Sequence, residues 1–415
     1  MKVIKIATAG SVDDGKSTLI GRLLYDTHSL TEDKLQAIEE KSRQRGFDYL
    51  DFSLATDGLV AEREQGITID VAHIYFSTLN TSFIIADAPG HIEYTRNMVT
   101  GASTAQASIV LVDARNGVVE QTYRHFFINN LLRIKDVVIA INKMDLVDYS
   151  EEKFNQIKGE IEYLASKSNY PDQNITFIPL SALQGDNVVE TSENMPWYQG
   201  RTLLRHLEDL HQEDAQEKSE TRFPIQTVIR PKTQEYHDFR GYAGKVYGGD
   251  LSVGDEIIVL PSKTRSKVKN IHFFHQEYHT AKRGSSVTVE LEDNVNVSRG
   301  DMLVKANQTP EIVKELSATI CWMDKTPLQP SARYYVKHGV HDVQAKVMDI
   351  SSVIHTDFSG KELSPSKLTL NEIGEVQLKL SKPIFIDSYD KNKANGAFIL
   401  IDAKTNNTAG VGFVN

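Results

Sequence analysis

Residues 10–17, GSVDDGKS, constrain the fold of this chain more than any other stretch. They fit the pattern G-x-x-x-x-G-K-[ST] and stand between an apolar run, VIKIAT (3–8), and an amphipathic stretch, KSTLIGRLLYD (16–26). This context predicts a strand, a glycine-rich turn and a helix in succession. Gly10 and Gly15 let the backbone curl so that its N–H groups face phosphate oxygens. The stretch therefore predicts a phosphate-binding loop at the start of an α/β domain.

Short apolar runs alternate with amphipathic stretches through the first half of the chain. The later runs are FIIA, SIVLV, VVIAI and ITFIPL, at 83–86, 108–112, 137–141 and 175–180. Between them lie stretches of helical periodicity, such as 95–106 and 152–165. This alternation favours a mostly parallel sheet with helices on both faces. Ligands of such sheets bind beyond the carboxyl ends of the strands. Four polar motifs follow runs directly: GSVDDGKS, DAPGH, NKMD and SAL.

The second half of the chain has a different pattern. Residues 211–222, HQEDAQEKSETR, are polar and charged without apolar periodicity, which predicts a linker. Short β-type runs split by Gly, Asp and Pro turns follow, and a second all-β series begins at LSATICWMD (316–324). We therefore expect an α/β P-loop domain over 1–215, followed by two small all-β barrel domains over 216–308 and 309–415.

Charge and cysteine content limit the class of protein. The 415 residues carry a formal net charge of −10, which argues against a large nucleic-acid surface. Proteins bind phosphate backbones mainly through clustered Lys and Arg. The single cysteine, Cys321, excludes an internal disulfide, and its strand-like surroundings favour a packing role. No secretory leader and no apolar run long enough to cross a bilayer is present. We expect a cytoplasmic protein with no membrane and no nucleic-acid partner.

The phosphate-binding loop assigns roles to its side chains. Lys16 can reach the β- and γ-phosphates of a nucleotide, and the Ser17 hydroxyl can bind Mg²⁺. The helix that begins near Lys16 adds the positive end of its dipole. The expected nucleotide-binding residues of this loop are Gly10, Ser11, Val12, Asp13, Asp14, Gly15, Lys16, Ser17 and Thr18.

NKMD, residues 142–145, indicates which base is bound. The Asp145 carboxylate can accept hydrogen bonds from guanine N1–H and the exocyclic amine, whereas adenine would leave it unpaired. Asn142 can hold the loop and meet the far edge of the base, and the Lys143 stem can lie over the ring. In the SAL motif (Ser181, Ala182, Leu183), the Ala182 N–H can donate to guanine O6. The expected nucleotide is GTP.

DAPGH, residues 87–91, follows the FIIA run and faces the γ-phosphate end of the expected site. Asp87 can hold Mg²⁺ through a water, and the Gly90 N–H can sense the γ-phosphate. His91 is a candidate for orienting the attacking water, and the alternative is a packed or exposed histidine. Ala88 and Pro89 complete this loop.

AEREQGITID (61–70) carries Thr68, a second candidate ligand for Mg²⁺. Such a segment acts as a switch when γ-phosphate and Mg²⁺ order it and hydrolysis releases it. Thr is also a common strand residue. The candidate catalytic residues are therefore His91, Lys16, Thr68 and Gly90, and the candidate metal ligands are Ser17, Thr68 and Asp87.

These motifs resemble the translational GTPases of the elongation factor Tu type, in which a P-loop GTPase domain precedes two β-barrels. Longer stretches are similar to the large, GTP-hydrolysing subunits of bacterial ATP sulfurylases. They include DGLVAEREQGITIDVAHIYFST (57–78), IIADAPGHIEYTRNMVTGAST (84–104), MPWYQGRTLL (195–204) and WMDKTPLQPSARYYVKHG (322–339). The resemblance covers essentially the whole chain.

The resemblance implies a coupled reaction. ATP and sulfate would give adenylyl sulfate and pyrophosphate on a separate small catalytic subunit, driven by GTP hydrolysis on this chain, in an expected heterodimer. The chain has one P-loop and neither S-G-G-x-D-S nor H-x-G-H, so adenylyl transfer is not expected on it, and no adenylyl-sulfate kinase domain is expected. The resemblance also implies that Val12 and Ile67 flank His91 as an apolar gate and that Asp13 helps to hold a monovalent cation, although packing or capping roles are equally consistent.

Three positions depart from the pattern of the resembled family. Ala88 stands where Thr is usual, and Tyr123 and Lys393 each stand where Arg is usual. The neighbouring Asp87, Pro89, Gly90 and His91 are intact, so we expect little consequence from Ala88.

Two other functions compete with the coupled reaction. A factor that delivers aminoacyl-tRNA or another RNA to the ribosome would share the three-domain plan, but the acidic balance opposes it. A GTP-dependent regulator would hydrolyse GTP without a coupled reaction. NIHFFHQEYHTAKRG (270–284) clusters histidines and aromatics, and we interpret it as a strand and loop of the first barrel, with a metal or nucleic-acid site as the alternative. HGVH (338–341) fits a barrel turn.

Overall fold

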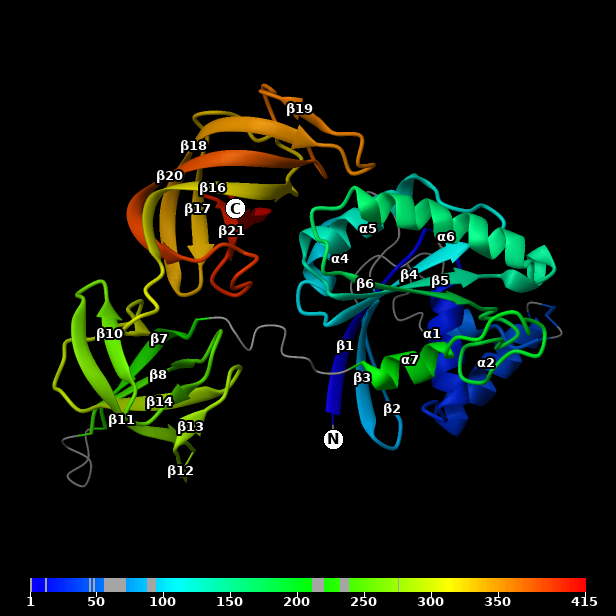
Figure 1. Cartoon of the computed structure of the whole chain (residues 1–415), viewed down its shortest axis with the longest axis horizontal. Coiled ribbons are helices and arrows are strands. Elements are labelled where there is room, and N and C mark those ends of the chain that lie inside the picture. Colours follow the sequence, from blue (N-terminus) through cyan, green and yellow to red (C-terminus); the bar gives the residue numbers. More distant parts are fainter. Residues whose placement is uncertain are drawn as a thin grey trace. The chain divides into compact units, whose positions relative to one another are not determined.

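The computed structural model describes residues 2–11, 13–44, 46–47, 49–55, 72–87, 95–210, 220–231, 239–274 and 276–415. The chain divides into two compact units (Figure 1). The first comprises Met1–Gln212 with His355–Gly360, and the second comprises Glu213–Ile354 with Lys361–Asn415. Within the described residues, no helix is both long and apolar enough to span a bilayer.

A six-stranded sheet forms the centre of the first unit, in the order β2-β3-β1-β4-β5-β6. Its strands are β1 (Lys2–Ala9), β2 (Ala72–Ser77), β3 (Thr81–Asp87), β4 (Ala107–Asp113), β5 (Asp136–Asn142) and β6 (Asn174–Pro179). All neighbours are parallel except β2, which is antiparallel to β3. The five predicted apolar runs form β1, β3, β4, β5 and β6, whereas the edge strand β2 was not predicted.

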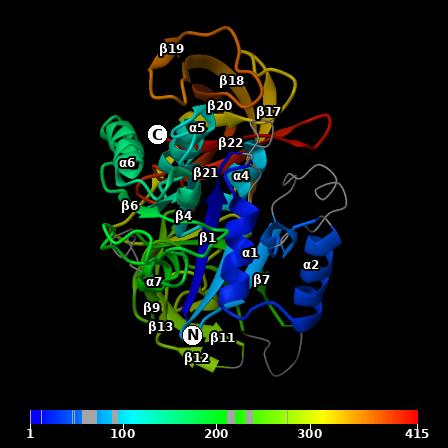
Figure 2. The ribbon, with the colours of Figure 1, turned by 90° about the vertical axis from the view of Figure 1, so that its right-hand side faces the viewer.

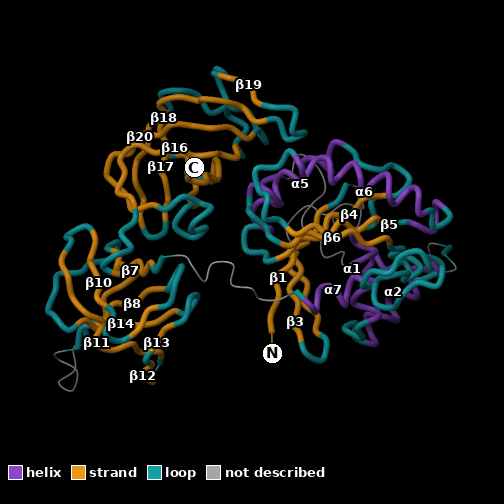
Figure 3. Tube along the Cα trace, viewed as in Figure 1, coloured by secondary structure: helices purple, strands orange, loops and turns teal. Residues whose placement is uncertain are grey.

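Helices cover both faces of this sheet (Figure 3). They are α1 (Lys16–Asp26), α2 (Glu32–Gln44), α4 (Thr95–Ala102), α5 (Glu120–Leu131), α6 (Glu151–Ser166) and α7 (Leu203–Asp209), with short 3-10 turns η1 (Phe52–Ala55) and η3 (Met144–Val147). Helix α1 lies beside β1 (Figure 2). Leu19 and Leu23 of α1 join a buried cluster with Ile6 of β1. The helices α1 and α7 share this face, and α4, α5 and α6 lie on the other (Figure 1).

Two closed barrels make up the second unit. The first contains β7 (Arg222–Ile229), β8 (Gly241–Lys245), β9 (Leu251–Ser252), β10 (Glu256–Leu260), β11 (Thr264–Phe273), β12 (Gln276–Tyr278), β13 (Thr280–Ala281), β14 (Ser286–Leu291) and β15 (Met302–Lys305). Pairing of β10 with β11 closes it. The described part of NIHFFHQEYHTAKRG forms part of β11, then β12 and β13, as predicted, and His275 lies outside the described residues.

The second barrel contains β16 (Glu311–Trp322), β17 (Arg333–His338), β18 (His341–Ile354), β19 (Lys361–Leu363), β20 (Ile373–Ile386), β21 (Ala397–Asp402) and β22 (Thr408–Val414). Pairing of β17 with β18 closes it. The motif HGVH forms the tight turn between these two strands, as predicted. Cys321 is fully buried in β16, which confirms its packing role. The predicted fold class, an α/β domain followed by two barrels, is confirmed.

The prediction for one linker residue is wrong. Residues 211–219 lie outside the described part of the chain, but Arg222, expected at the end of the linker, begins β7 and is 1% exposed. Its guanidinium donates to both oxygens of Asp387 in the second barrel, at 2.9 and 2.7 Å. The polar sequence around Arg222 predicted a solvated side chain, but the ion pair with Asp387 buries its charge.

Candidate nucleotide-binding site

The predicted motifs meet at one edge of the six-stranded sheet. Parallel pairing places Thr8 opposite Asp87, and Asp113 opposite Asn142, so polar residues lie at the carboxyl ends of β1, β3, β4 and β5. The chain after β6 adds Ser181, Ala182 and Leu183 to the same edge, because Leu180 N–H donates to Ile141 O. This edge is the carboxyl end of the parallel strands, where ligands of such sheets bind.

The loop between β1 and α1 has a conformation that depends on glycine. Gly15 has φ of 90°, in the left-handed region, and a Cβ there would lie 2.4 Å from Asn142 Nδ2. Asp14 closes the turn, because its carboxylate accepts from Ser11 N–H at 2.6 Å and its own N–H donates to Ser11 O at 3.2 Å. The helix α1 begins at Lys16, so Lys16, Ser17 and Thr18 lie in its first turn. The loop thus directs a helix N-terminus toward the site.

Lys16 and Asp87 form a buried ion pair. The Lys16 amino group lies 2.8 Å from Asp87 Oδ1, and the two side chains are 8% and 3% exposed. The Thr8 hydroxyl donates to the same carboxylate oxygen at 3.0 Å. The expected phosphate-binding cation and the expected Mg²⁺-holding carboxylate are therefore adjacent.

Asn142 connects the two loops that would hold the two ends of a nucleotide. Its Nδ2 donates to Asp14 O in the phosphate-binding loop at 2.7 Å. Its Oδ1 accepts from the Ala182 N–H at 2.9 Å. Asn142 thus holds the loop as expected, and the Ala182 N–H, expected to meet guanine O6, donates to Asn142 in this structure. The contact with O6 stays a prediction.

Lys143 extends from the same loop toward the phosphate-binding loop. Its backbone has φ of 64°, and its amino group donates to the Asp13 carbonyl and lies 3.0 Å from Asp113 Oδ2. Arg115 also contacts both oxygens of Asp113, at 3.0 Å through Nε and 2.6 Å through Nη2. Asp113 therefore fixes the Lys143 side chain across the site.

Asp145 carries an oxygen without a hydrogen-bond partner among the residues that the structure describes. It lies in the 3-10 turn η3, and its Oδ1 is buried without a hydrogen bond in the described structure. A buried carboxylate oxygen without a donor is costly unless a ligand supplies one. The amide-like N1–H and amine of guanine are donors of the required kind. This observation fits the predicted base-binding role.

Two acidic side chains at the site have shifted pKa values in opposite directions. Burial raises the pKa of Asp14 to about 6, and the charge of Asp113 adds to this effect against the Ser11 hydrogen bond and the charge of Lys143. Burial also raises the pKa of Asp113, but hydrogen bonds from Arg115 and Lys143 outweigh it and hold that pKa at about 2. Asp113 therefore stays ionised, whereas Asp14 can take up a proton in mildly acidic solution.

Several predicted site residues lie outside the described residues. They are Val12, Ile67, Thr68, Ala88, Pro89, Gly90 and His91. Their roles stay predictions. Sequence reasoning also missed Asp113 and Arg115. The signal for Asp113 was a carboxylate directly after a run of buried apolar residues, the same signal that pointed to Asp87.

Comparison with protein families gives two matches. Residues 1–213 match the elongation factor Tu GTP binding domain, and residues 315–415 match the GTP-eEF1A C-terminal domain-like family. Among solved structures, Sup35 complexed with GDP covers 100% of this chain and 93% of its own at 21% identity, with a TM-score of only 0.44.

Individual relatives are similar over nearly the whole chain. The bifunctional enzyme CysN/CysC of Mycobacterium tuberculosis is 48% identical over 99% of this chain and 67% of its own length. Sulfate adenylyltransferase subunit 1 of Bacteroides fragilis is 48% identical over 99% of this chain and 86% of its own. The same subunit of Colwellia psychrerythraea is 46% identical over 100% and 88%. These matches confirm the resemblance found in the sequence, and the chain belongs to the sulfate adenylyltransferase subunit 1 family, with a GTP-binding domain of the elongation factor Tu type.

Proposed function

We propose that this chain is the GTP-hydrolysing subunit of a sulfate adenylyltransferase. GTP hydrolysis here drives the formation of adenylyl sulfate and pyrophosphate from ATP and sulfate on a separate small subunit, in a cytoplasmic heterodimer. The observation that carries the proposal is an identity of 46–48% to proteins named sulfate adenylyltransferase subunit 1, through the GTP-binding domain and both barrels. The guanine-type site supports the same conclusion.

The described residues supply groups suited to binding a nucleotide. The backbone N–H groups of the phosphate-binding loop and the first turn of α1 surround the phosphates, and Lys16 neutralises their charge. Asp145 accepts from the guanine edge through its unpaired Oδ1. Asn142 keeps the base loop and the phosphate loop together. Selection of GTP over ATP then follows from the donor pattern of guanine.

The oxygen ligands at this edge suit Mg²⁺. Hydroxyl and carboxylate oxygens are the ligands this ion prefers, and Ser17 and Asp87 supply one of each beside Lys16. Ser17 and Asp87 would hold the ion, and Thr68, which lies outside the described residues, is the third proposed ligand. When bound, the ion would neutralise charge that develops on the phosphate oxygens. Lys16 would then exchange its contact with Asp87 for the phosphates.

Hydrolysis requires the residues outside the described ranges. We assign His91 to orienting the attacking water and the Gly90 N–H, with Thr68, to sensing the γ-phosphate. The coupled reaction replaces a phosphoanhydride of ATP by a less stable phosphate–sulfate anhydride, so it needs a driving force. A nucleotide switch supplies one only if the partner subunit binds its two states with different affinity.

The test measures pyrophosphate release from ATP and sulfate by this chain with its co-purified small subunit. GTP should stimulate release strongly, and Lys16→Ala or Asp145→Ala should abolish the stimulation. Reciprocally, the small subunit with ATP and sulfate should change the rate of GTP hydrolysis. Hydrolysis of GTP that never changes pyrophosphate release would instead indicate an uncoupled regulator. A GTP-dependent, salt-sensitive complex with aminoacyl-tRNA would indicate an RNA carrier.

A further inference from the structure

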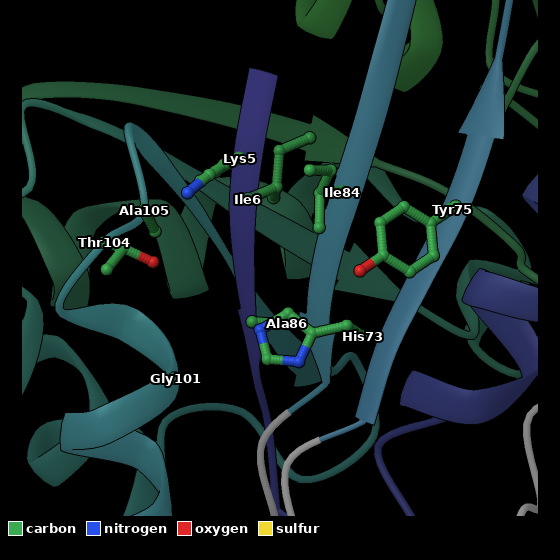
Figure 4. A pocket seen from close by; sticks show the side chains of 9 residues that line it. All are labelled: Lys5, Ile6, His73, Tyr75, Ile84, Ala86, Gly101, Thr104 and Ala105. Carbon is green, nitrogen blue, oxygen red and sulfur yellow. The ribbon is translucent and has the colours of Figure 1, made fainter. Parts of the chain in front are cut away.

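A small pocket opens on the sheet face of the first unit that carries α4 (Figure 4). Its volume is about 280 Å³. The lining residues are Lys5, Ile6, His73, Tyr75, Ile84, Ala86, Gly101, Thr104 and Ala105. The pocket runs from Lys5, in the middle of β1, to Ala86, the residue of β3 that precedes Asp87. It opens on the face of the sheet, whereas the nucleotide site lies at the carboxyl ends of the strands.

Strand register brings the pocket residues together. Lys5 of β1 is opposite Ile84 of β3, which is opposite Tyr75 of β2. In the next row of the same face, Ala86 is opposite His73. Paired residues of neighbouring strands point to the same side of a sheet, so these side chains share one face. The edge strand β2 lacks an outer neighbour in the described sheet, and Tyr75 is 67% exposed, so the face opens to solvent.

The floor of the pocket is apolar and its rim is polar. Ile84 and Ala86 lie between Lys5 on one side and Tyr75 on the other, and Thr104 lies on the Lys5 side (Figure 4). Small side chains at Ala86 and Ala105, together with Gly101, leave the space open. A ligand that fills this space would contact carbon atoms below and polar groups around it.

The rim has the charge of an anion-binding site. It presents the ammonium group of Lys5, the imidazole of His73 and the hydroxyls of Tyr75 and Thr104, and no Asp or Glu is among the lining residues that the structure describes. All four groups can donate hydrogen bonds. In a chain whose net charge is −10, a rim whose described residues include a cation and no carboxylate departs from the average surface. A single ammonium group matches one negative charge better than the two of a phosphate.

We propose that this pocket binds a carboxylate carried on a short apolar body. Its volume of about 280 Å³ is slightly below the range of typical small-molecule sites, roughly 300–1,000 Å³, which suits one side-chain-sized group and not a nucleotide. Two sources offer this chemistry: a free carboxylic acid, or an acidic side chain or C-terminus of the small subunit. The second source rests on the proposed function, and the first does not.

The first experiment uses phenylacetate as the probe and phenylacetamide, its neutral isostere, as the control. Saturation-transfer NMR with the full chain should show phenylacetate binding about tenfold more tightly than phenylacetamide, because the charged hydrogen bond to Lys5 is lost in the amide. Lys5→Glu should remove the preference, and Lys5→Gln should reduce it. Lys34→Gln makes the same charge change as Lys5→Gln at an exposed site on α2 and should leave binding intact.

Equal binding of the acid and the amide, or binding of the acid unchanged in Lys5→Glu, would overturn the proposal. Circular dichroism of each variant excludes unfolding as the cause of a loss. Lys5 is exposed on β1, so these substitutions leave the core unchanged.

A second experiment separates the two sources. The affinity of the small subunit is measured for wild type, Lys5→Glu and Lys34→Gln, with and without phenylacetate. An acidic group of the subunit as the occupant predicts a loss of about tenfold in Lys5→Glu and competition by phenylacetate. If Lys5→Glu leaves the affinity for the small subunit unchanged while wild type binds phenylacetate, the occupant of the pocket is a free carboxylic acid. The phenylacetate assay measures binding without turnover. The pocket proposal can therefore fail while GTP-stimulated pyrophosphate release is observed, and it can hold when that stimulation is absent.

Discussion

The amino group of Lys16 lies 2.8 Å from the carboxylate of Asp87, and neither side chain is more than 8% exposed. Each is predicted to contact a different charge of the nucleotide complex: Lys16 the phosphates, and Asp87 the Mg²⁺ ion. In the protein alone they compensate each other, which avoids two isolated buried charges. On this proposal, binding of Mg²⁺ and GTP would replace one ion pair by two favourable contacts and would leave neither of these two charges uncompensated.

Asp87→Asn tests the role of this ion pair in the stability of the fold and, separately, its role in GTP hydrolysis. Loss of the carboxylate should lower the free energy of unfolding by about 3–5 kcal/mol without nucleotide, because Lys16 loses a buried counter-charge. Mg²⁺ and GDP should recover part of this loss, since the phosphates supply negative charge. GTP hydrolysis should fall on the order of 10–100-fold. Thermal unfolding with and without nucleotide gives the comparison.

Thr8→Val is the matched control for Asp87→Asn, because it removes the other hydrogen bond to Asp87 Oδ1 without changing charge. Its effect should be the same with and without nucleotide. An equal loss of stability in Asp87→Asn under both conditions would contradict the exchange of partners.

Local patterns predicted most of the described residues that meet at this edge of the sheet, and tertiary contacts account for those that were missed. Gly15 and Lys16 were predictable because a strand, a turn and a helix adjacent in sequence specify the loop. The role of Asp113 was not, because it depends on the pairing of β4 with β5 and on Lys143, 30 residues further along the chain. Arg222 was assigned to a linker because its neighbours are charged, and its partner Asp387 lies 165 residues away.

Asn142→Ala should weaken binding of all guanine nucleotides alike. The change leaves the Asp14 carbonyl and the Ala182 N–H without their partner, and each lost hydrogen bond costs about 1 kcal/mol. We expect the dissociation constants of GTP and GDP to rise together by roughly 10–30-fold. Fluorescent nucleotide titration measures both. A change confined to GTP would mean that Asn142 acts at the γ-phosphate and not as a link between the loops.

Asp145→Asn should change which base is bound. Xanthine has a carbonyl where guanine has its amine, and an amide side chain can donate to that carbonyl and accept from N1–H. We expect the preference for GTP over xanthosine triphosphate to fall on the order of 100-fold or to reverse. Hydrolysis assays with both nucleotides measure the ratio. Asp148→Asn, an exposed change three residues further along, should leave the ratio unchanged.

Asp14 should make the stability of the first unit depend on pH. Its folded pKa of about 6 exceeds the ordinary 3.8, so the folded chain keeps a proton that the unfolded chain has released. The resulting stability is fully present below about pH 4 and is lost as the pH rises through 6. The stability advantage of wild type over Asp14→Asn should therefore shrink by about 2–3 kcal/mol between pH 4 and pH 7.

Urea unfolding followed by helical circular dichroism measures this difference, because every α-helix in the described residues belongs to the first unit. Glu40→Gln, which changes an exposed carboxylate on α2, is the matched control. A difference between wild type and Asp14→Asn that stays constant from pH 4 to pH 7 would show that Asp14 does not hold its proton in the folded chain.

The Arg222–Asp387 pair should be the main electrostatic contribution to the joining of the two barrels. Arg222 is 1% exposed and also donates to the Gln308 carbonyl at 2.6 Å. Arg222→Met should cost about 3–5 kcal/mol, because it leaves Asp387 buried without its cation. Arg222→Met with Asp387→Leu should recover much of this loss, since neither charge then remains.

Lys379→Met is the control, because it breaks an exposed pair with Glu315 and should cost less than about 1 kcal/mol. Urea unfolding in a Trp197→Phe background, followed through buried Trp322 as the remaining tryptophan, measures all three. A loss in Arg222→Met no larger than in Lys379→Met would contradict a structural role for the buried pair.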